Sequence, residues 1–398
     1  MNNNDIETPY FLINRDLLQQ NTDTFIEGMQ CNWERVKLSY SVKTNSLPWI
    51  LRFMNQKGVM AEVVSDEEYD LAIMCDFNPE NIVFNGPIKG KEHLEFALKN
   101  NSYVNIDSES DLDVIQSCNI YSNRIGIRLN IPPALFSSKD IEYTEDGFRF
   151  GFSVENGSFE RALKKIKNQC DIKKIGVHLH CNSITRSLNV YRAIAEYVVA
   201  VVDKYKIEPC YLDFGGGFFG GVPGKTTPSE YFNVITSIIK RTPRLRNTLL
   251  LAEPGSALIG STVELHTTVV DVKDTNCSRI ITTDGSRIHI DPLWIKNGYL
   301  YSISYKDGEK RKYEEKQIIC GYTCMDHDRL MVLMNEPELK AGDKIIYQRV
   351  GAYSMTFGGP FIRYLPDVYV DSNNELQLVR RRMKTEEYYR INTAQSMQ

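Results

Sequence analysis

Three consecutive glycines, Gly215, Gly216 and Gly217, form the stretch of the sequence best suited to hold a small anion. They directly follow an apolar segment, residues 210–214, that reads as a strand. Because glycine has no Cβ, several backbone N–H groups can converge there on one ligand. The run is therefore a candidate phosphate loop. A simple turn is the alternative interpretation.

Lys43 stands at the end of another apolar segment, within LSYSVKTN (residues 38–45). Burial lowers the pKa of an amine, and a neutral lysine can form a Schiff base with a carbonyl group. Lys43 is thus a candidate nucleophile. A lysine that has already left the strand and lies in water is the alternative.

His178 and His180 lie two residues apart in GVHLHCNS (residues 176–183), so both side chains share one face of a strand. Such a pair can bind a metal, but the other histidines offer no supporting spacing, and we predict no metal site. Alternatively, one imidazole stacks on a planar cofactor while Ser183 contacts its phosphate. Packing in the core is the third interpretation.

Glu253 closes a further apolar segment, in LLLAEPGS (residues 249–256). A buried carboxylate needs a cationic partner. A protonated pyridine nitrogen would be such a partner, and a salt bridge to a lysine or arginine of the chain is the alternative.

Two more candidate segments, GYTCMDHD (residues 321–328) and GAYS (residues 351–354), occur in the C-terminal part of the chain. We place both in loops at strand ends. Cys324 is a possible reactive group of the first, although a lone loop cysteine is usually inert. Tyr353 of the second can donate a hydrogen bond to a phosphate or only pack.

The elements that would position these residues alternate regularly along the first part of the chain. Apolar, β-rich segments are each followed by a helix-like or loop segment, and they cover residues 36–42, 59–64, 82–85, 103–106, 124–130, 174–180, 210–214 and 248–252. Eight such units predict an α/β fold with a closed parallel barrel, in which the carboxyl ends of the strands carry the chemistry. A doubly wound open sheet is the alternative, but no GxGxxG motif opens the chain.

After about residue 262 the pattern changes to strand-like segments separated by turns, with no long helix between them. We predict strands at residues 263–272, 278–283, 299–305, 317–321 and 343–350, and a solvated hairpin at the charged run 306–316. The predicted domains are a (β/α)8 barrel over 30–262, an antiparallel β-sandwich or barrel from 1–29 and 263–385, and a disordered tail over 386–398.

The composition excludes several classes of protein. At 398 residues with 42% hydrophobic residues, the chain can bury substantial cores, and its net charge of -4 gives no pull toward nucleic acid or anionic membranes. The nine cysteines contain no CxxC pair, which indicates reduced thiols in a cytoplasmic protein. We find no leader peptide and no segment of membrane-spanning length, so we expect no membrane partner.

Together these motifs resemble the fold-type III PLP-dependent decarboxylases, the group of ornithine, arginine and diaminopimelate decarboxylases, which share a barrel with the alanine racemases. The resemblance covers roughly residues 8–365 through five or more motifs in the right order. It implies pyridoxal 5′-phosphate (PLP) as the cofactor, an amino acid as the small-molecule substrate, and a homodimer whose active sites form at the subunit interface.

The resemblance also implies roles for individual residues. Lys43 matches the Schiff-base lysine, and His180 matches the ring-stacking histidine. Glu253 matches the partner of the pyridine nitrogen, and Cys324 the cysteine that reaches the neighbouring subunit's active site. The matched phosphate contacts are Ser183, Gly215, Gly216, Gly217, Gly255 and Tyr353. Further positions beside the cofactor are Glu62, Arg128 and Ser256, the last of which replaces an arginine that the family often adds to the phosphate site.

The departures from the family pattern concern the substrate's distal end. Ornithine and diaminopimelate decarboxylases place an acidic residue directly after the cysteine to receive the distal ammonium, and here that position is Met325. Asp326 or Asp328 could substitute if re-aimed. The Arg-Pro pair that binds the distal carboxylate in diaminopimelate enzymes is absent from residues 291–300. The predicted substrate-binding residues are Met325, Asp326, Asp328 and Tyr353.

A carboxylate beside the ring nitrogen keeps it protonated, which favours decarboxylation, whereas racemases of this fold place an arginine there. We therefore expect PLP-dependent decarboxylation of an unusual or conjugated α-amino acid in a biosynthetic pathway such as siderophore or antibiotic assembly, with Lys43 and Cys324 as catalytic residues. The alternatives are a diaminopimelate- or ornithine-type decarboxylase with re-aimed specificity, a racemase, a catalytically silent homologue, and a metal-dependent hydrolase.

Overall fold

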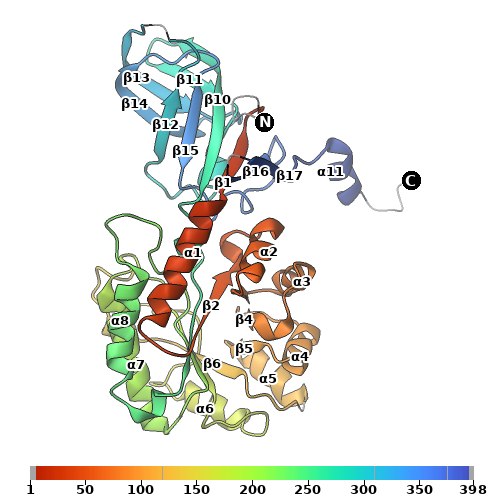
Figure 1. Cartoon of the computed structure of the whole chain (residues 1–398), viewed down its shortest axis with the longest axis vertical. Helices are drawn as coiled ribbons and strands as arrows, with labels where there is room; N and C mark the ends of the chain where they lie inside the picture. The colour runs from red at the N-terminus through yellow and green to blue at the C-terminus, as the bar shows by residue number, and fades with distance from the viewer. Residues whose placement is uncertain (1–5, 119, 309, 374, 394–398) are drawn as a thin grey trace. The chain divides into compact units, whose positions relative to one another are not determined.

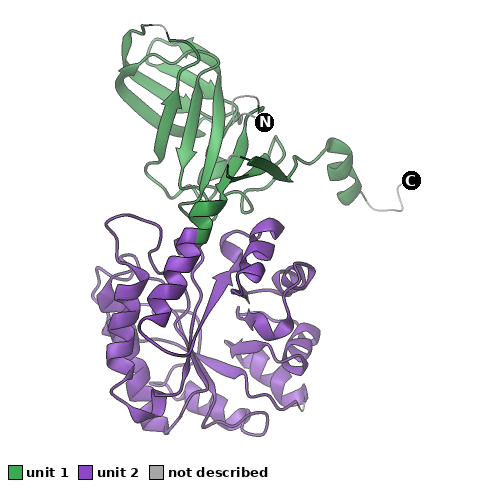
Figure 2. Ribbon diagram, in the orientation of Figure 1, with its two compact units in different colours: residues 1–19, 259–398 green, residues 20–258 purple. Residues whose placement is uncertain are grey.

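The computed structural model describes residues 6–118, 120–308, 310–373 and 375–393. The chain forms two compact units, which Figure 2 distinguishes by colour. One contains residues 20–258, and the other combines residues 1–19 with 259–398. The first division falls inside helix α1 (Arg15–Gln30) rather than after it, about ten residues before the predicted boundary.

Residues 20–258 form a closed barrel of eight strands, in which each strand pairs in parallel with the next and β9 pairs with β2. The strands are β2 (Val36–Ser41), β3 (Met60–Val63), β4 (Ile82–Phe84), β5 (Tyr103–Ile106), β6 (Ile125–Leu129), β7 (Gly176–Leu179), β8 (Tyr211–Asp213) and β9 (Leu249–Ala252). Each lies within two residues of its predicted range. The barrel prediction is confirmed, and the open-sheet alternative is wrong.

Burial explains why the barrel strands were recognisable. The strands from β3 to β8 are buried at every position, as expected when helices cover the outside and side chains fill the inside. Figure 1 shows the helices of this unit around the strands. They are α2 (Pro48–Gln56), α3 (Asp66–Met74), α4 (Lys91–Lys99), α5 (Glu109–Cys118), α6 (Ser158–Lys165), α7 (Leu188–Tyr205) and α8 (Pro228–Ile239).

Tyr211 fills the barrel interior because two neighbouring strands lack side chains beside it. A Cβ added to Gly126 or Gly176 would overlap with the Tyr211 side chain. The buried phenol donates a hydrogen bond to Asn105 Oδ1 at 2.8 Å. This packing fixes the position of Asn105, which belongs to the polar network described below.

The second unit contains a nine-stranded sheet. Its strands are β1 (Tyr10–Asn14), β10 (Val263–Asp274), β11 (Arg279–Thr283), β12 (Leu300–Ser304), β13 (Tyr313–Cys320), β14 (Arg329–Pro337), β15 (Lys344–Gln348), β16 (Asp367–Ser372) and β17 (Glu375–Arg380). The prediction of a purely antiparallel sheet is wrong, because β1 pairs with β16 and β11 pairs with β13 in parallel. Parallel pairing needs a long connection, and about thirty residues separate β11 from β13.

Two further predictions about this unit need correction. The charged run 306–316 is not wholly solvated: Tyr313–Lys316 belongs to β13, and the buried Arg311 guanidinium lies between Asp343 and Asp307. The predicted disordered tail contains helix α11 (Thr385–Ile391), whose start is held by Glu387 accepting from Lys384 N at 2.8 Å. Residues 394–398 lie outside the described residues.

Four short helical elements lie close to predicted site residues. The turn η2 (Val42–Thr44) follows β2, and α9 (Ser256–Ile259) follows β9. The turn η4 (Pro133–Leu135) and helix α10 (Arg287–Ile290) follow β6 and β11. Among the described residues, no helix combines the length and the apolar character needed to cross a bilayer.

Candidate active site

Closure of the barrel brings the carboxyl ends of its eight strands to one mouth, and polar side chains stand at each of them. The residues are Ser41, Lys43, Glu62, Asn85, Asn105, Asp107, Arg128, His178, His180, Asp213 and Glu253. The barrel therefore assembles the predicted residues Lys43, Glu62, Arg128, His180 and Glu253 from five different strand ends.

Lys43 lies in the turn η2, beyond the end of β2, with 42% of its side chain exposed. Its Nζ donates to Glu62 Oε2 at 2.7 Å and to Ser41 Oγ at 2.9 Å. Burial raises the pKa of Glu62, but the charge of Lys43 and the hydrogen bonds from Lys43, Ser41 and Asn85 outweigh it, so that the pKa lies below its ordinary value. The amine is thus neither deeply buried nor left to solvent, because a buried carboxylate holds it.

The two histidines of β7 occupy different surroundings. His178 is buried in the barrel interior, with Nε2 at 3.6 Å from Glu253 Oε2, and neither ring nitrogen has a hydrogen-bond partner among the described residues. His180 follows the strand and is partly exposed. Burial, and then the nearby charges of Arg128 and Lys43, lower the pKa of His180 to about 3. It is therefore a neutral ring that can stack on a flat ligand.

The glycine loop approaches its neighbours too closely for side chains. A Cβ on Gly215 would lie 2.7 Å from the Cβ of His180, and one on Gly216 would lie 2.7 Å from the carbonyl oxygen of Glu253. Gly215 and Gly217 have φ of 59° and 86°, which glycine adopts at little cost. Gly255 is equally confined, because its Cβ would overlap with the side chain of Thr44.

One amide of the loop is used inside the protein. Gly215 N donates to Asp213 Oδ1 at 2.9 Å, so its N–H is directed at a carboxylate of the chain and not at a bound ligand. For Gly216 N and Gly217 N no acceptor is found among the described residues. Ser183 lies in the loop after β7, where its Oγ accepts from Arg186 N at 3.0 Å. Ser256 opens α9 directly after Gly255.

A buried amide network that the sequence interpretation missed connects the carboxylates at the barrel mouth. Asn85 Nδ2 donates to Glu62 Oε1 at 3.0 Å and to Glu253 Oε1 at 2.7 Å. Asn105 Nδ2 donates to Asn85 Oδ1 at 2.9 Å and to Asp213 Oδ2 at 3.1 Å. The signal was present in the sequence, because each of these polar residues interrupts or ends an apolar strand.

Arg128 stands beside a cavity of about 560 Å³. Its guanidinium donates to Asp107 Oδ2 at 3.1 Å and lies 4.6 Å from the ring centre of Phe150. Asp107 also accepts from Gly151 N at 2.6 Å, which holds the segment after Phe150 against the barrel mouth. His180 and Asn182 line the same cavity. The cavity offers space for a ligand next to the His180 ring.

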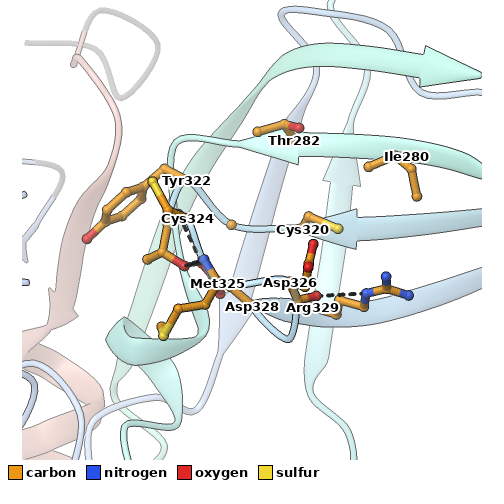
Figure 3. A pocket seen from close by; sticks show the side chains of 11 residues that line it. Ile280, Thr282, Cys320, Tyr322, Cys324, Met325, Asp326, Asp328 and Arg329 are labelled. Carbon is orange, nitrogen blue, oxygen red and sulfur yellow. Dashed lines mark hydrogen bonds between the residues drawn. The ribbon is translucent and has the colours of Figure 1, made fainter. Parts of the chain in front are cut away.

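The remaining predicted residues belong to the other unit. Cys324, Met325 and Asp326 line a cavity of about 390 Å³ beside the turn between β13 and β14. In Figure 3, Cys324 and Met325 lie on the Tyr322 side of this turn, and Asp326 and Arg329 lie on the other side. Tyr353 is 39% exposed and has a φ of 53°.

Asp328, a predicted substrate-binding residue, is buried and ties its loop to the start of α10. Its carboxylate accepts from Ser286 Oγ at 2.9 Å, Arg287 N at 2.9 Å and Thr323 Oγ1 at 2.7 Å. These three donors hold the loop that carries Cys324. Asp326, which is exposed, is the better candidate for contact with a substrate.

A family model described as "Pyridoxal-dependent decarboxylase, pyridoxal binding domain" matches residues 19–260. The chain is 26% identical to a probable chloroplastic diaminopimelate decarboxylase of Oryza sativa subsp. japonica, over 96% of this chain and 79% of that protein. It is 25% identical to the L-glutamyl-[BtrI acyl-carrier protein] decarboxylase of Niallia circulans, over 94% and 91%. The solved diaminopimelate decarboxylase of M. jannaschii in complex with L-lysine superposes with a TM-score of 0.84 at 22% identity, covering 98% and 93%.

The residues of the barrel mouth fit a bound PLP. In the glycine loop, Gly216 N and Gly217 N have no acceptor among the described residues, so both amides are available to a phosphate. Lys43 supplies an amine, His180 a neutral ring, and Glu253 a buried carboxyl group for a pyridine nitrogen. The chain belongs to the pyridoxal-dependent decarboxylases, and its cofactor is PLP.

Proposed function

We propose that this PLP-dependent amino-acid decarboxylase acts on an α-amino acid whose distal end is uncharged because it is conjugated, and not on free diaminopimelate or ornithine. The observation that carries the proposal is the turn at Cys324. The position after the cysteine is Met325, and the nearby Asp328 already accepts hydrogen bonds from Ser286, Arg287 and Thr323. An apolar side chain there gives no counter-charge to a distal ammonium group.

The relatives support this substrate class without deciding it. The Niallia circulans protein acts, by its name, on a glutamyl group carried by an acyl-carrier protein. Such a substrate keeps a free α-amino acid head, while its distal carboxyl is esterified and uncharged. Other relatives are diaminopimelate decarboxylases. The second candidate is therefore decarboxylation of diaminopimelate, with Asp326 in place of the usual acid that binds the distal ammonium group.

We assign the residues as follows. PLP supplies the electron sink for the electron pair left when CO2 departs. Lys43 holds the cofactor, and Glu62 is the carboxylate closest to its amine and can accept the proton that the amine must lose. His180 covers the ring. The proposed phosphate contacts are Ser183, Gly216, Gly217, Gly255, Ser256 and Tyr353. Gly215, the other contact predicted from the sequence, donates its N–H to Asp213 and shapes the loop through its positive φ.

The proposed second catalytic residue is Cys324, which returns a proton to the substrate's α-carbon. In the family this cysteine serves the neighbouring subunit, so the proposal includes a homodimer with shared active sites. Arg128, Met325, Asp326 and Tyr353 are the proposed neighbours of the substrate. A cytoplasmic location and the absence of a metal stay predictions.

A panel of substrates tests the proposal. The purified enzyme with PLP is given diaminopimelate, ornithine, lysine, free glutamate, and a glutamyl thioester on a carrier protein or on a short pantetheine mimic, and CO2 release is measured. We expect kcat/KM to be highest for a thioester or another conjugated amino acid. Fastest turnover of diaminopimelate would favour the second candidate, and product mass would identify racemisation.

A further inference from the structure

We propose that Asp213 is a positioning residue that shares one proton with Glu253, and that this buried pair holds in advance the proton that the ring nitrogen of bound PLP carries. The inference rests on the proposed place of Glu253 beside that nitrogen. It concerns a residue that the sequence interpretation did not select and that the proposed catalytic steps do not use.

The two carboxyl groups lie in the barrel interior on neighbouring strands, β8 and β9. Asp213 is fully buried and Glu253 is 4% exposed. An oxygen of Asp213 lies within 4.8 Å of an oxygen of Glu253, and the two carboxyl groups face each other as side-chain hydrogen-bond partners. Carboxylate oxygens are acceptors only, so two carboxyl groups can be hydrogen-bonded to each other only if one of them keeps its proton.

The remaining oxygens of the pair have their donors already. Both oxygens of Asp213 accept N–H groups, from Gly215 N at 2.9 Å and Asn105 Nδ2 at 3.1 Å. Glu253 Oε1 accepts from Asn85 Nδ2 at 2.7 Å. The two Asp213 contacts stabilise a charged carboxylate at that residue. The shared proton therefore belongs on Glu253.

The charges around the pair lead to the same assignment. The titratable groups that face it are Glu62, Lys43, His178 and Tyr211. The single cation among them, Lys43, is paired with Glu62. Burial lowers the pKa of His178, so its ring is neutral. Burial, and then repulsion by Asp213 and Glu62, raise the pKa of Glu253 well above its ordinary value.

A pyridine nitrogen placed at Glu253 changes which group holds the proton. The O–H bond of Glu253 breaks and an N–H bond forms, which leaves a carboxylate paired with a ring cation. No proton has to enter from solvent, and the total charge of the interior stays the same. The fixed charge of Asp213 then stabilises the ring cation through Glu253, which is why we describe Asp213 as a positioning residue.

Infrared difference spectroscopy of the protein with and without PLP tests the inference directly. At pH 9, where Glu68 with its pKa of about 7 is ionised, we expect the apoprotein to show the C=O band of a protonated, buried carboxylic acid, and PLP binding to remove it. The band should be absent from apo Asp213→Asn and Glu253→Gln. A wild-type apoprotein without the band, or a band that persists after PLP binds, would overturn the proposal, and neither reading requires a variant to fold.

Calorimetric titration with PLP in buffers of different ionisation enthalpy gives a second readout. At pH 8, Asp213→Asn should take up about one more proton per site than the wild type, because Glu253 is then ionised before PLP binds. Asp203→Asn, a carboxylate on α7 that accepts from Thr242, is the matched control and should behave as wild type. Equal uptake in wild type and Asp213→Asn would count against the shared proton.

Two further outcomes separate the possible failures. If Glu253→Gln binds PLP with an unchanged visible spectrum and affinity, the proposed place of Glu253 is wrong and the inference falls with it. If Glu253→Gln is impaired while Asp213→Asn is not, only the inference fails. Because His178, Asp213 and Glu253 lie within 4.8 Å of one another, stoichiometric metal in the purified apoprotein would also overturn the proton assignment.

Discussion

The acidic residues of the barrel mouth and those of the turn at Cys324 differ in burial and in hydrogen bonding. At the mouth, Glu62, Asp213 and Glu253 are buried and joined by amide donors and one lysine. At the turn, Asp328 is buried and its hydrogen bonds stabilise the loop. Asp326 is exposed, and the position beside the cysteine is a methionine. Under the proposed roles, the groups for cofactor chemistry are held within the barrel core, whereas substrate recognition is assigned to a loop outside it.

The largest effect should come from the barrel side of this comparison. Lys43→Ala removes the amine that holds PLP, so we expect no detectable turnover and no protein-bound cofactor after borohydride reduction, as judged by intact mass. Lys57→Ala, which breaks an ion pair with Asp23, is the control and should retain both. Turnover by Lys43→Ala would show that the barrel mouth is not the site of chemistry.

Cys324→Ala tests whether the turn contributes to chemistry as well as recognition. Loss of a proton donor should lower kcat by about 10²–10⁴-fold while the PLP spectrum and affinity stay unchanged. Cys320→Ala is a matched control, since Cys320 is the last residue of β13 and lines the same cavity as Cys324. A fully active Cys324→Ala would assign the turn to recognition alone.

Met325→Glu tests the substrate preference by placing an acid directly after the cysteine. Because a carboxylate favours a distal ammonium, we expect kcat/KM for ornithine or diaminopimelate to rise by about tenfold relative to a neutral conjugate. Met325→Gln has a similar shape without the charge and should give no such change. If Asp326→Asn rather than Met325→Glu alters this ratio, the exposed aspartate is the receptor.

The sequence predicted the barrel well and the site only in part. Its strands were recognisable because they are buried on both faces, whereas β14, β16 and β17 were missed because exposed polar positions break their pattern. Asn85, Asn105 and Asp213 were missed because asparagine and aspartate at a strand end resemble turn residues. Only closure of the barrel shows that these three side chains meet. The parallel pairs of the second unit could not be predicted from local sequence either.

The smallest effect concerns Glu68, a half-buried acid of α3 that accepts fewer hydrogen bonds from the described residues than Glu62 does. Its Oε2 accepts from Val64 N at 2.9 Å at the start of α3. Burial, and then repulsion by Glu62, raise its pKa to about 7, against 4.5 for an ordinary glutamate. The folded protein therefore keeps a proton that the unfolded chain releases, and this contribution to stability is lost as pH rises through about 7.

We expect the free energy of unfolding of the wild type to fall by about 2–3 kcal/mol between pH 5 and pH 8 from this group. Glu68→Gln keeps an oxygen for Val64 N and does not titrate, so urea denaturation should show a correspondingly flatter pH dependence. Glu67→Gln changes an exposed acid one residue away in the same helix and should leave the wild-type slope in place. Equal slopes for wild type and Glu68→Gln would mean that Glu68 is ionised in the folded barrel.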